Sequence, residues 1–270
     1  MSSLLVVMVW NESENGTIGR MKSLLVANWK MNPPTFKEAK KLFEATKKAA
    51  DTVKSVSIVV APPAIYVREL RASYRGKRIA FGVQNAHFEA KGSYTGEISM
   101  AEAKDAGAAY VIIGHAERRA MGETNDDTRK KVASAIAHSI FPVLCVGEKE
   151  RGHEGEHFDL IKEQLKTGFA DVLIAKIPRV MIAYETVWAI GAETAMNPRD
   201  MHEMAIFIRK TIVGLYGEKG MVVKILYGGS IDERNASDML THGDIAGLLV
   251  GRASADPEKL TALVRAIKNV

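Results

Sequence analysis

The sequence predicts a (β/α)8 barrel built as one domain, and three observations support this fold class. Eight short apolar runs alternate with segments of helical pattern. The runs are rich in Val and Ile and are apolar throughout, which is typical of parallel strands buried on both faces. The length of 270 residues suits one barrel with a sizeable core. The expected strands are SLLVANW, VSIVVAP, RIAFGVQN, YVIIGH, FPVLCVGE, VMIAYE, VKILYGG and IAGLLVG.

Helix start signals stand between these runs. Thr35 and Glu38 have the spacing of a capping box. Thr124 precedes two acidic residues of an expected first turn, where negative charge is stabilising. The pairs Asn197-Pro198 and Asp256-Pro257 each place a capping residue before a proline suited to the first helical position. Helices are therefore expected to begin at these points.

An open doubly wound sheet is the alternative fold. It favours a glycine-rich fingerprint after the first strand, whereas this chain has NWKMNPP there. No linker follows Met21, so residues 21–270 are expected to form one barrel domain. Residues 1–20 hold a short apolar core with no basic residue before it and no cleavage signal after it. We expect them to form a loosely ordered N-terminal extension.

Composition excludes several functional classes. Lys and Arg total 37 against 32 Asp and Glu, and the excess is scattered, so a nucleic-acid surface is disfavoured while a small anionic substrate is compatible. No apolar stretch approaches the roughly 20 residues that span a bilayer. The lone Cys145 lies in an apolar run and cannot form an internal disulfide. A buried cysteine and a cytoplasmic protein are expected.

Barrel enzymes build their sites from loops at the carboxyl ends of the strands, and this rule selects Glu185 and His115. Glu185 ends the sixth run among large apolar residues, which suits a general base because an apolar setting raises the pKa of a carboxyl. The alternative is an acid paired with an arginine. His115 follows the fourth run at a helix start, where a neutral ring can donate a hydrogen bond to a carbonyl. The alternative is a structural histidine.

Other chemistry-bearing residues follow the first, seventh and eighth runs. Lys30 directly follows a buried strand and can stabilise negative charge, with a surface lysine as the alternative; Asn28 points to the same side. The turns YGGS and VGRAS offer backbone N–H groups for a phosphate, with plain tight turns as the alternative. No catalytic Ser-His-Asp pattern, P-loop or metal-ligand spacing is present. The set fits proton abstraction beside a carbonyl on a small phosphorylated sugar, through an enediolate.

The same residues make the sequence resemble the triosephosphate isomerases. The similarity runs from about Met21 to the C-terminus. It rests on ANWKMN, GVQNAHFEAKGSYTGEIS, IGHAERR, VLCVGE, AYETVWAIG, YGGSI and GLLVGRAS, in family order and spacing. The resemblance implies a TIM barrel that interconverts dihydroxyacetone phosphate and glyceraldehyde 3-phosphate, in glycolysis and gluconeogenesis, without a cofactor or metal.

The resemblance also implies a role for each matching residue. Glu185 matches the base, His115 the neutral electrophile, and Lys30 the cation that supports the enediolate. The substrate-binding and supporting positions that match are Asn28, Gly191, Ser230, Gly251 and Arg252 for the substrate, Glu117 as the partner of Lys30, and Tyr227 as a contact of the loop after the base.

A homodimer is a further implication. Residues 88–99 resemble the loop that reaches into the partner subunit in this family. Thr95 matches the residue that touches the partner's Asn28. We therefore expect two copies of the chain to associate through this loop.

The sequence departs from the family pattern around the base. Ala116 stands where a serine hydroxyl usually holds the base at rest. Thr186 replaces a proline after the base, and we expect a hinge with more backbone freedom. GAETAMNP replaces GTGKTATP, which brings in Glu193 and the bulkier Met196. We still expect this loop to reach Tyr227 and Ser230 through backbone N–H groups.

Overall fold

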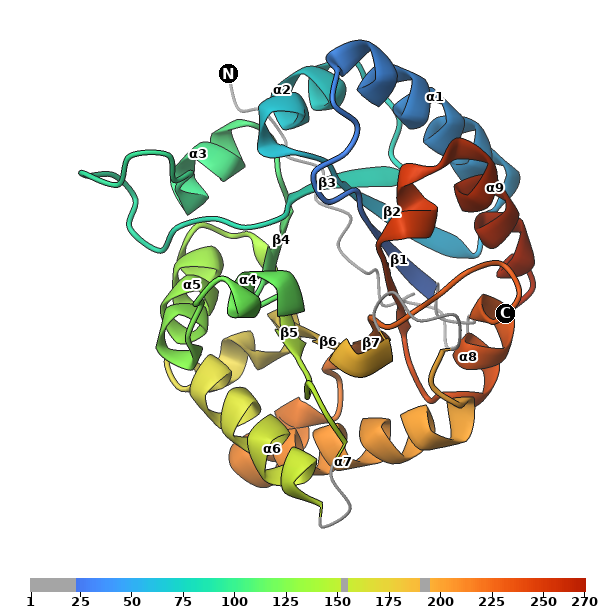
Figure 1. The fold of residues 1–270 in the computed structure, drawn as a ribbon. Coiled ribbons are helices and arrows are strands. Elements are labelled where there is room, and N and C mark those ends of the chain that lie inside the picture. The colour runs from blue at the N-terminus through green and yellow to red at the C-terminus, as the bar shows by residue number, and fades with distance from the viewer. Residues whose placement is uncertain (1–22, 152–154, 190–194) are drawn as a thin grey trace, which may run out of the picture.

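The computed structural model describes residues 23–151, 155–189 and 195–270, so the expectations for residues 1–20 and for Gly191 and Glu193 lie outside the described residues. Eight parallel strands form a closed barrel in chain order, and β8 pairs with β1 (Figure 1), which confirms the predicted fold. Each strand lies within the run that predicted it. The strands are β1 Ser23–Asn28, β2 Val56–Ala61, β3 Ile79–Val83, β4 Tyr110–Ile113, β5 Phe141–Val146, β6 Met181–Tyr184, β7 Lys224–Tyr227 and β8 Gly247–Val250.

Helices surround the ring of strands (Figure 1). The α-helices are α1 Phe36–Thr52, α2 Ala64–Ala72, α3 Met100–Asp105, α4 Ala116–Ala120, α5 Asn125–Ala137, α6 Glu156–Phe169, α7 Pro198–Tyr216, α8 Ala236–His242 and α9 Pro257–Ala266. Short 3-10 helices are η1 Ile174–Arg179, η2 Val187–Ala189, η3 Gly217–Gly220 and η4 Arg252–Ala255. No helix in the described ranges is long and apolar enough to cross a membrane.

The predicted helix starts are observed. Thr124, Asn197 and Asp256 cap α5, α7 and α9 through their side chains. Thr35 caps α1 by accepting a hydrogen bond from Glu38 N at 3.3 Å, so the structure shows one half of the expected capping box. In α5 the box is reciprocal, because the acidic side chain at its third position also bonds back to Thr124 N.

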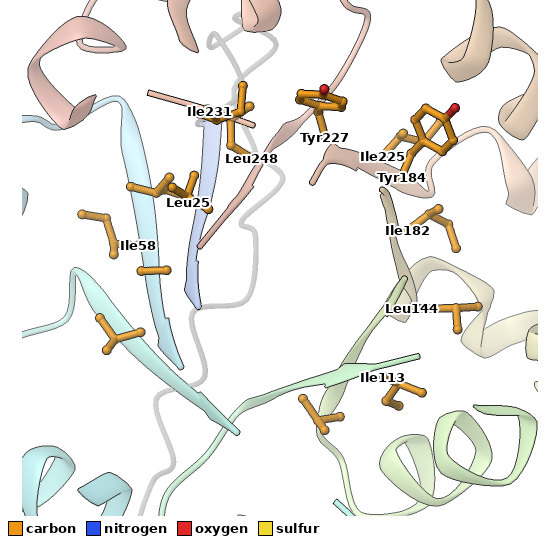
Figure 2. Close-up of a cluster of buried hydrophobic side chains, with 14 of the residues drawn as sticks. Leu25, Ile58, Ile113, Leu144, Ile182, Tyr184, Ile225, Tyr227, Ile231 and Leu248 are labelled. Atoms are coloured by element: carbon orange, nitrogen blue, oxygen red, sulfur yellow. The ribbon is translucent and has the colours of Figure 1, made fainter. Parts of the chain in front are cut away.

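Two apolar clusters show how the strands alternate. Leu25 and Ala27 belong to a cluster that also contains helix side chains such as Leu42, so these strand residues face outward. Leu24 and Val26 belong to a second cluster formed by strand residues, which fills the barrel interior. Figure 2 shows outward-facing strand residues arranged around the ring. Each buried aliphatic side chain contributes about 1.5–3 kcal/mol to folding, so the barrel is a rigid scaffold.

The lone cysteine lies in the barrel interior. Cys145 is fully buried and free, as expected from its apolar run. Burial, followed by the charge of Glu185, raises the pKa of its thiol well above the ordinary value. The thiol is therefore protonated and packs as a small apolar group.

Candidate active site

Glu185 follows β6 on the inward side, two residues after the interior Ala183. It is 2% exposed, and its Oε2 accepts a hydrogen bond from Ala116 N at 2.8 Å. Among the described residues its Oε1 accepts no hydrogen bond, although it is buried. Burial raises the pKa of the carboxyl, and His115, the Ala116 N–H and Lys30 offset this rise only in part. The carboxylate is thus buried and its pKa is raised, as predicted, although polar groups as well as apolar ones surround it.

His115 caps α4 and faces the carboxylate. Its Nδ1 accepts a hydrogen bond from Glu117 N at 3.2 Å, so this nitrogen carries no proton. The ring is therefore neutral, with its hydrogen on Nε2. His115 Nε2 lies 3.2 Å from Glu185 Oε1, without the alignment of a hydrogen bond. The imidazole donor and the buried oxygen thus border the same small space.

Lys30 is held at the mouth of the barrel by β1, by α4 and by the loop after β3. Its φ of 55° lies in the left-handed region, a strained conformation that is concentrated at functional sites. Asn28 Oδ1 accepts from Lys30 N at 3.0 Å, and Gln84 Nε2 donates to Lys30 O at 2.7 Å. The ammonium pairs with Glu117, the partner that the sequence predicts. Lys30 is therefore fixed, unlike a surface lysine.

Gly251 makes room for this lysine. A Cβ at Gly251 would lie 3.0 Å from Lys30 Cε, which is tighter than ordinary contact. The glycine after β8 therefore has a packing reason besides the phosphate contact that the sequence predicts. Ser230 and Arg252 follow β7 and β8 at the same end of the barrel. Gly191 lies outside the described residues.

Two further glycines leave space for the base itself. A Cβ at Gly147 would lie 1.9 Å from Glu185 O, and one at Gly228 would lie 3.0 Å from Glu185 Cγ. Gly147 follows β5 and Gly228 follows β7, the two neighbours of β6. The position of the carboxylate therefore depends on the absence of side chains on both adjacent strands.

A backbone N–H binds Glu185 at the position where the family usually has a serine. Ala116 lacks the serine hydroxyl, and the observed hydrogen bond to Glu185 comes from the backbone N–H of this residue. A backbone donor is unaffected by the side chain. The resting position of the base is thus supported without a serine.

Sequence reasoning missed Glu148, a buried carboxylate after β5. It accepts hydrogen bonds from Tyr184 OH at 2.7 Å and from Trp188 Nε1 at 3.1 Å. Tyr184 directly precedes Glu185, and Trp188 lies three positions after it, so Glu148 holds both sides of the base. The signal was present, because Glu148 ends an apolar strand run in the same way as Glu185.

A second missed group lies beside α4. Lys131 Nζ donates to Glu123 Oε1 and to Asn85 Oδ1, both at 2.9 Å. The side chains of Lys131 and Glu123 are 6% and 2% exposed. Arg118 Nε lies 3.7 Å from Glu123 Oε2. This buried ion pair supports the segment that follows His115.

A hydrogen-bonded group around Tyr227 was predicted only in part. Thr186 Oγ1 lies 3.1 Å from Tyr227 OH, and Met196 N donates to the same hydroxyl at 3.1 Å. The second contact is the one expected between the loop backbone and Tyr227. Thr186 was expected to give the hinge more backbone freedom, and its bonded side chain was not predicted.

A buried carboxylate, a neutral imidazole and an ion-paired lysine meet at the carboxyl end of an eight-stranded α/β barrel. This combination defines a barrel enzyme equipped for proton transfer beside a polarised carbonyl. No group of three or more His, Cys, Asp or Glu side chains in the described part of the chain is arranged to hold a metal ion.

Comparison with known proteins identifies the family. Residues 23–267 match the family model for triosephosphate isomerase. A triosephosphate isomerase of Endomicrobium trichonymphae is 42% identical over 246 residues, which cover 90% of this chain and 98% of the relative. One of Aquifex aeolicus is 39% identical over 246 residues, covering 90% and 99%. The chain belongs to the triosephosphate isomerase family, as its motifs indicated.

Proposed function

We propose that this chain interconverts dihydroxyacetone phosphate and D-glyceraldehyde 3-phosphate by proton transfer through an enediolate. The observation that carries the proposal is the buried Glu185 oxygen facing the neutral imidazole of His115. Family membership supports it, because the relatives are named for this reaction.

In this proposal each group has a role. Glu185 takes the proton from the carbon beside the carbonyl and returns it to the former carbonyl carbon, while the hydroxyl proton passes from one substrate oxygen to the other. His115 Nε2–H donates to the carbonyl oxygen as negative charge develops there. Lys30 supplies positive charge to the same intermediate, and Asn28 binds the substrate. A carboxylate whose pKa is raised by burial suits this work because it binds a proton more strongly than an exposed carboxylate does.

The phosphate of the substrate is proposed to lie beyond β7 and β8. Ser230, Gly251 and Arg252 stand there, and Gly191 completes the set by its match to the family motif. Backbone N–H groups in glycine-containing turns are suited to phosphate because they carry partial positive charge and need no side-chain room. The role of Arg252 is supported by its position after β8.

Replacement of Glu185 by glutamine tests the proposal. Wild-type protein mixed with glyceraldehyde 3-phosphate in a coupled assay should turn over rapidly, and chelator should not change the rate. Glu185→Gln removes the base while keeping its shape, so kcat should fall by about 10²–10⁴-fold or more. Glu203→Gln, an exposed site on α7, is the matched control and should behave as wild type. No turnover by wild-type protein would refute the proposal.

We also propose a homodimer that uses residues 88–99. This segment, between β3 and α3, projects away from the barrel (Figure 1). Large apolar side chains are exposed after β1, at the end of α4 and within the loop itself: Met31 at 93%, Met121 at 77% and Tyr94 at 44%. A partner subunit would cover them, with Thr95 reaching its Asn28.

Sedimentation of the purified protein tests the dimer. Tyr94→Glu should shift the protein toward a monomer because it places a charge in the proposed contact. Leu173→Glu is the control, since this residue is 73% exposed elsewhere and should leave the mass unchanged. A wild-type monomer at micromolar concentration would contradict the proposal.

We infer a cytoplasmic setting in glycolysis and gluconeogenesis. The inference is supported by the family and by a lone cysteine kept buried and unpaired. Fractionation of cells with an antibody to this chain would test it, and recovery of the protein outside the cytoplasm would contradict it.

A further inference from the structure

Thr186 has an unusual position for a residue that adjoins a catalytic base. It is fully buried, and its Oγ1 lies 3.1 Å from Tyr227 OH. The same hydroxyl accepts a hydrogen bond from Met196 N at 3.1 Å. One phenol therefore joins the residue after the base, the end of β7 and the segment that leads into α7.

The backbone around Glu185 is held differently on its two sides. Toward β5, Glu185 N donates to Val146 O at 2.8 Å and Val187 N donates to Glu148 O at 3.2 Å. Toward β7, the backbone ladder continues to the hydrogen bond from Gly228 N to Tyr184 O at 2.8 Å. Beyond this point the described link to β7 is the side-chain contact of Thr186 with Tyr227. The contact thus extends the strand pairing past the base.

The surroundings are shaped around this pair of hydroxyls. A Cβ at Gly229 would lie 2.1 Å from Tyr227 OH and 2.7 Å from Thr186 Oγ1. The glycine therefore leaves the space that the hydroxyls occupy. A buried hydroxyl that loses its hydrogen-bond partner destabilises the fold. Removal of either hydroxyl should therefore change the contribution of the other to stability.

We propose that Thr186 is a positioning residue: its hydroxyl, through Tyr227, fixes the chain that carries Glu185 and so places the carboxylate for proton transfer. The inference rests on the isomerase function proposed above. Thr186 is fully buried and its hydroxyl contacts Tyr227, so in this proposal it acts through its neighbours. Its loss should therefore lower kcat, because a small displacement of a base is expensive, while KM changes little.

A double-mutant cycle tests the proposal. Thr186→Val keeps the shape and burial of the side chain but removes the hydroxyl, and it should lower kcat about tenfold, which corresponds to ~1.4 kcal/mol. Tyr227→Phe should lower kcat at least as far, because it also removes the acceptor of Met196 N. The double variant should be no slower than Tyr227→Phe, because that change alone already breaks the contact that Thr186→Val removes. Thr186→Ser should restore kcat to within about twofold of wild type, since the conservative variant keeps the hydroxyl.

Thr46→Val is the matched control for this cycle. Thr46 is also fully buried, and its hydroxyl bonds to Leu42 O at 2.9 Å within α1, away from the site. The Thr46→Val protein should keep wild-type kcat even if its free energy of unfolding falls. The denaturant midpoints of all variants report the Thr186–Tyr227 contact independently of activity, and they should show the same non-additivity as kcat.

The results separate the positioning role of Thr186 from the proposed isomerase function. If Thr186→Val keeps wild-type kcat, or slows turnover no more than Thr46→Val, the positioning role is refuted. Additive effects of Thr186→Val and Tyr227→Phe on kcat and on the midpoints would also overturn it. An inactive wild-type protein would overturn the proposed function instead, while the midpoints would still show whether the contact exists.

Discussion

Gly147→Ala is expected to displace the base without touching it. The new Cβ would lie 1.9 Å from Glu185 O, whereas real Cβ atoms almost never come within 3.0 Å. Gly147 cannot yield easily, because its N–H donates to Gln164 Oε1 at 2.8 Å and its carbonyl accepts from Gln164 Nε2 at 3.1 Å. Glu185 must therefore move by about 1 Å, and a misplacement of about 1 Å costs on the order of 100-fold in rate.

Steady-state kinetics in the coupled assay measure this effect. We expect Gly147→Ala to lower kcat/KM about 100-fold and to destabilise the fold by about 1–3 kcal/mol through overpacking. Gly214→Ala is the control, since a Cβ there meets nothing within 4 Å, and it should leave both quantities close to wild type. A folded Gly147→Ala protein with kcat/KM within about threefold of wild type would refute the reasoning.

Two further predictions concern stability. Burial raises the folded-state pKa of Glu185 above 4.5, so ionisation of this carboxyl destabilises the fold as pH rises through the folded pKa. In denaturant titrations Glu185→Gln should therefore be more stable than wild type near neutral pH. The difference should vanish below pH 4.5, where the carboxyl is neutral. A difference that does not change with pH would contradict the assigned burial cost. Lys131→Met leaves the Glu123 carboxylate buried and should cost about 3–5 kcal/mol, or about 5–9 °C in melting temperature for a two-state chain of this length. Adding Glu123→Gln should recover part of the loss, and no recovery would show that packing, not the unpaired charge, is responsible.

The parts of the fold that depend on local pattern were predictable. Each apolar run contains its strand, because a strand buried on both faces needs an unbroken apolar sequence. The caps at Thr124, Asn197 and Asp256 were also predictable, since a cap involves residues at most three positions apart. The approach of Glu185 to His115 followed from the barrel rule that gathers strand ends.

Other features could not be predicted because they join distant residues through one atom. The hydroxyl of Thr186 meets Tyr227 from another strand, 41 positions later. The ammonium of Lys131 meets Asn85, 46 positions earlier. Ala116 was misleading for another reason. Its side chain indicated that a hydrogen bond to the base was lost, while the observed donor is a backbone N–H, which every residue except proline carries.

Closure of the barrel between β1 and β8 is expected to come after helix formation and before the folding chain gains its activity. Ser254 Oγ donates to Asn28 O at 3.2 Å across 226 positions, so the two ends of the described chain must meet before Asn28 and Lys30 are in place. Joining such distant segments is entropically costly and slow, whereas helices form locally and early. During refolding from denaturant, helical signal should therefore return before catalysis, and enzyme turnover becomes a reporter of the final step of assembly.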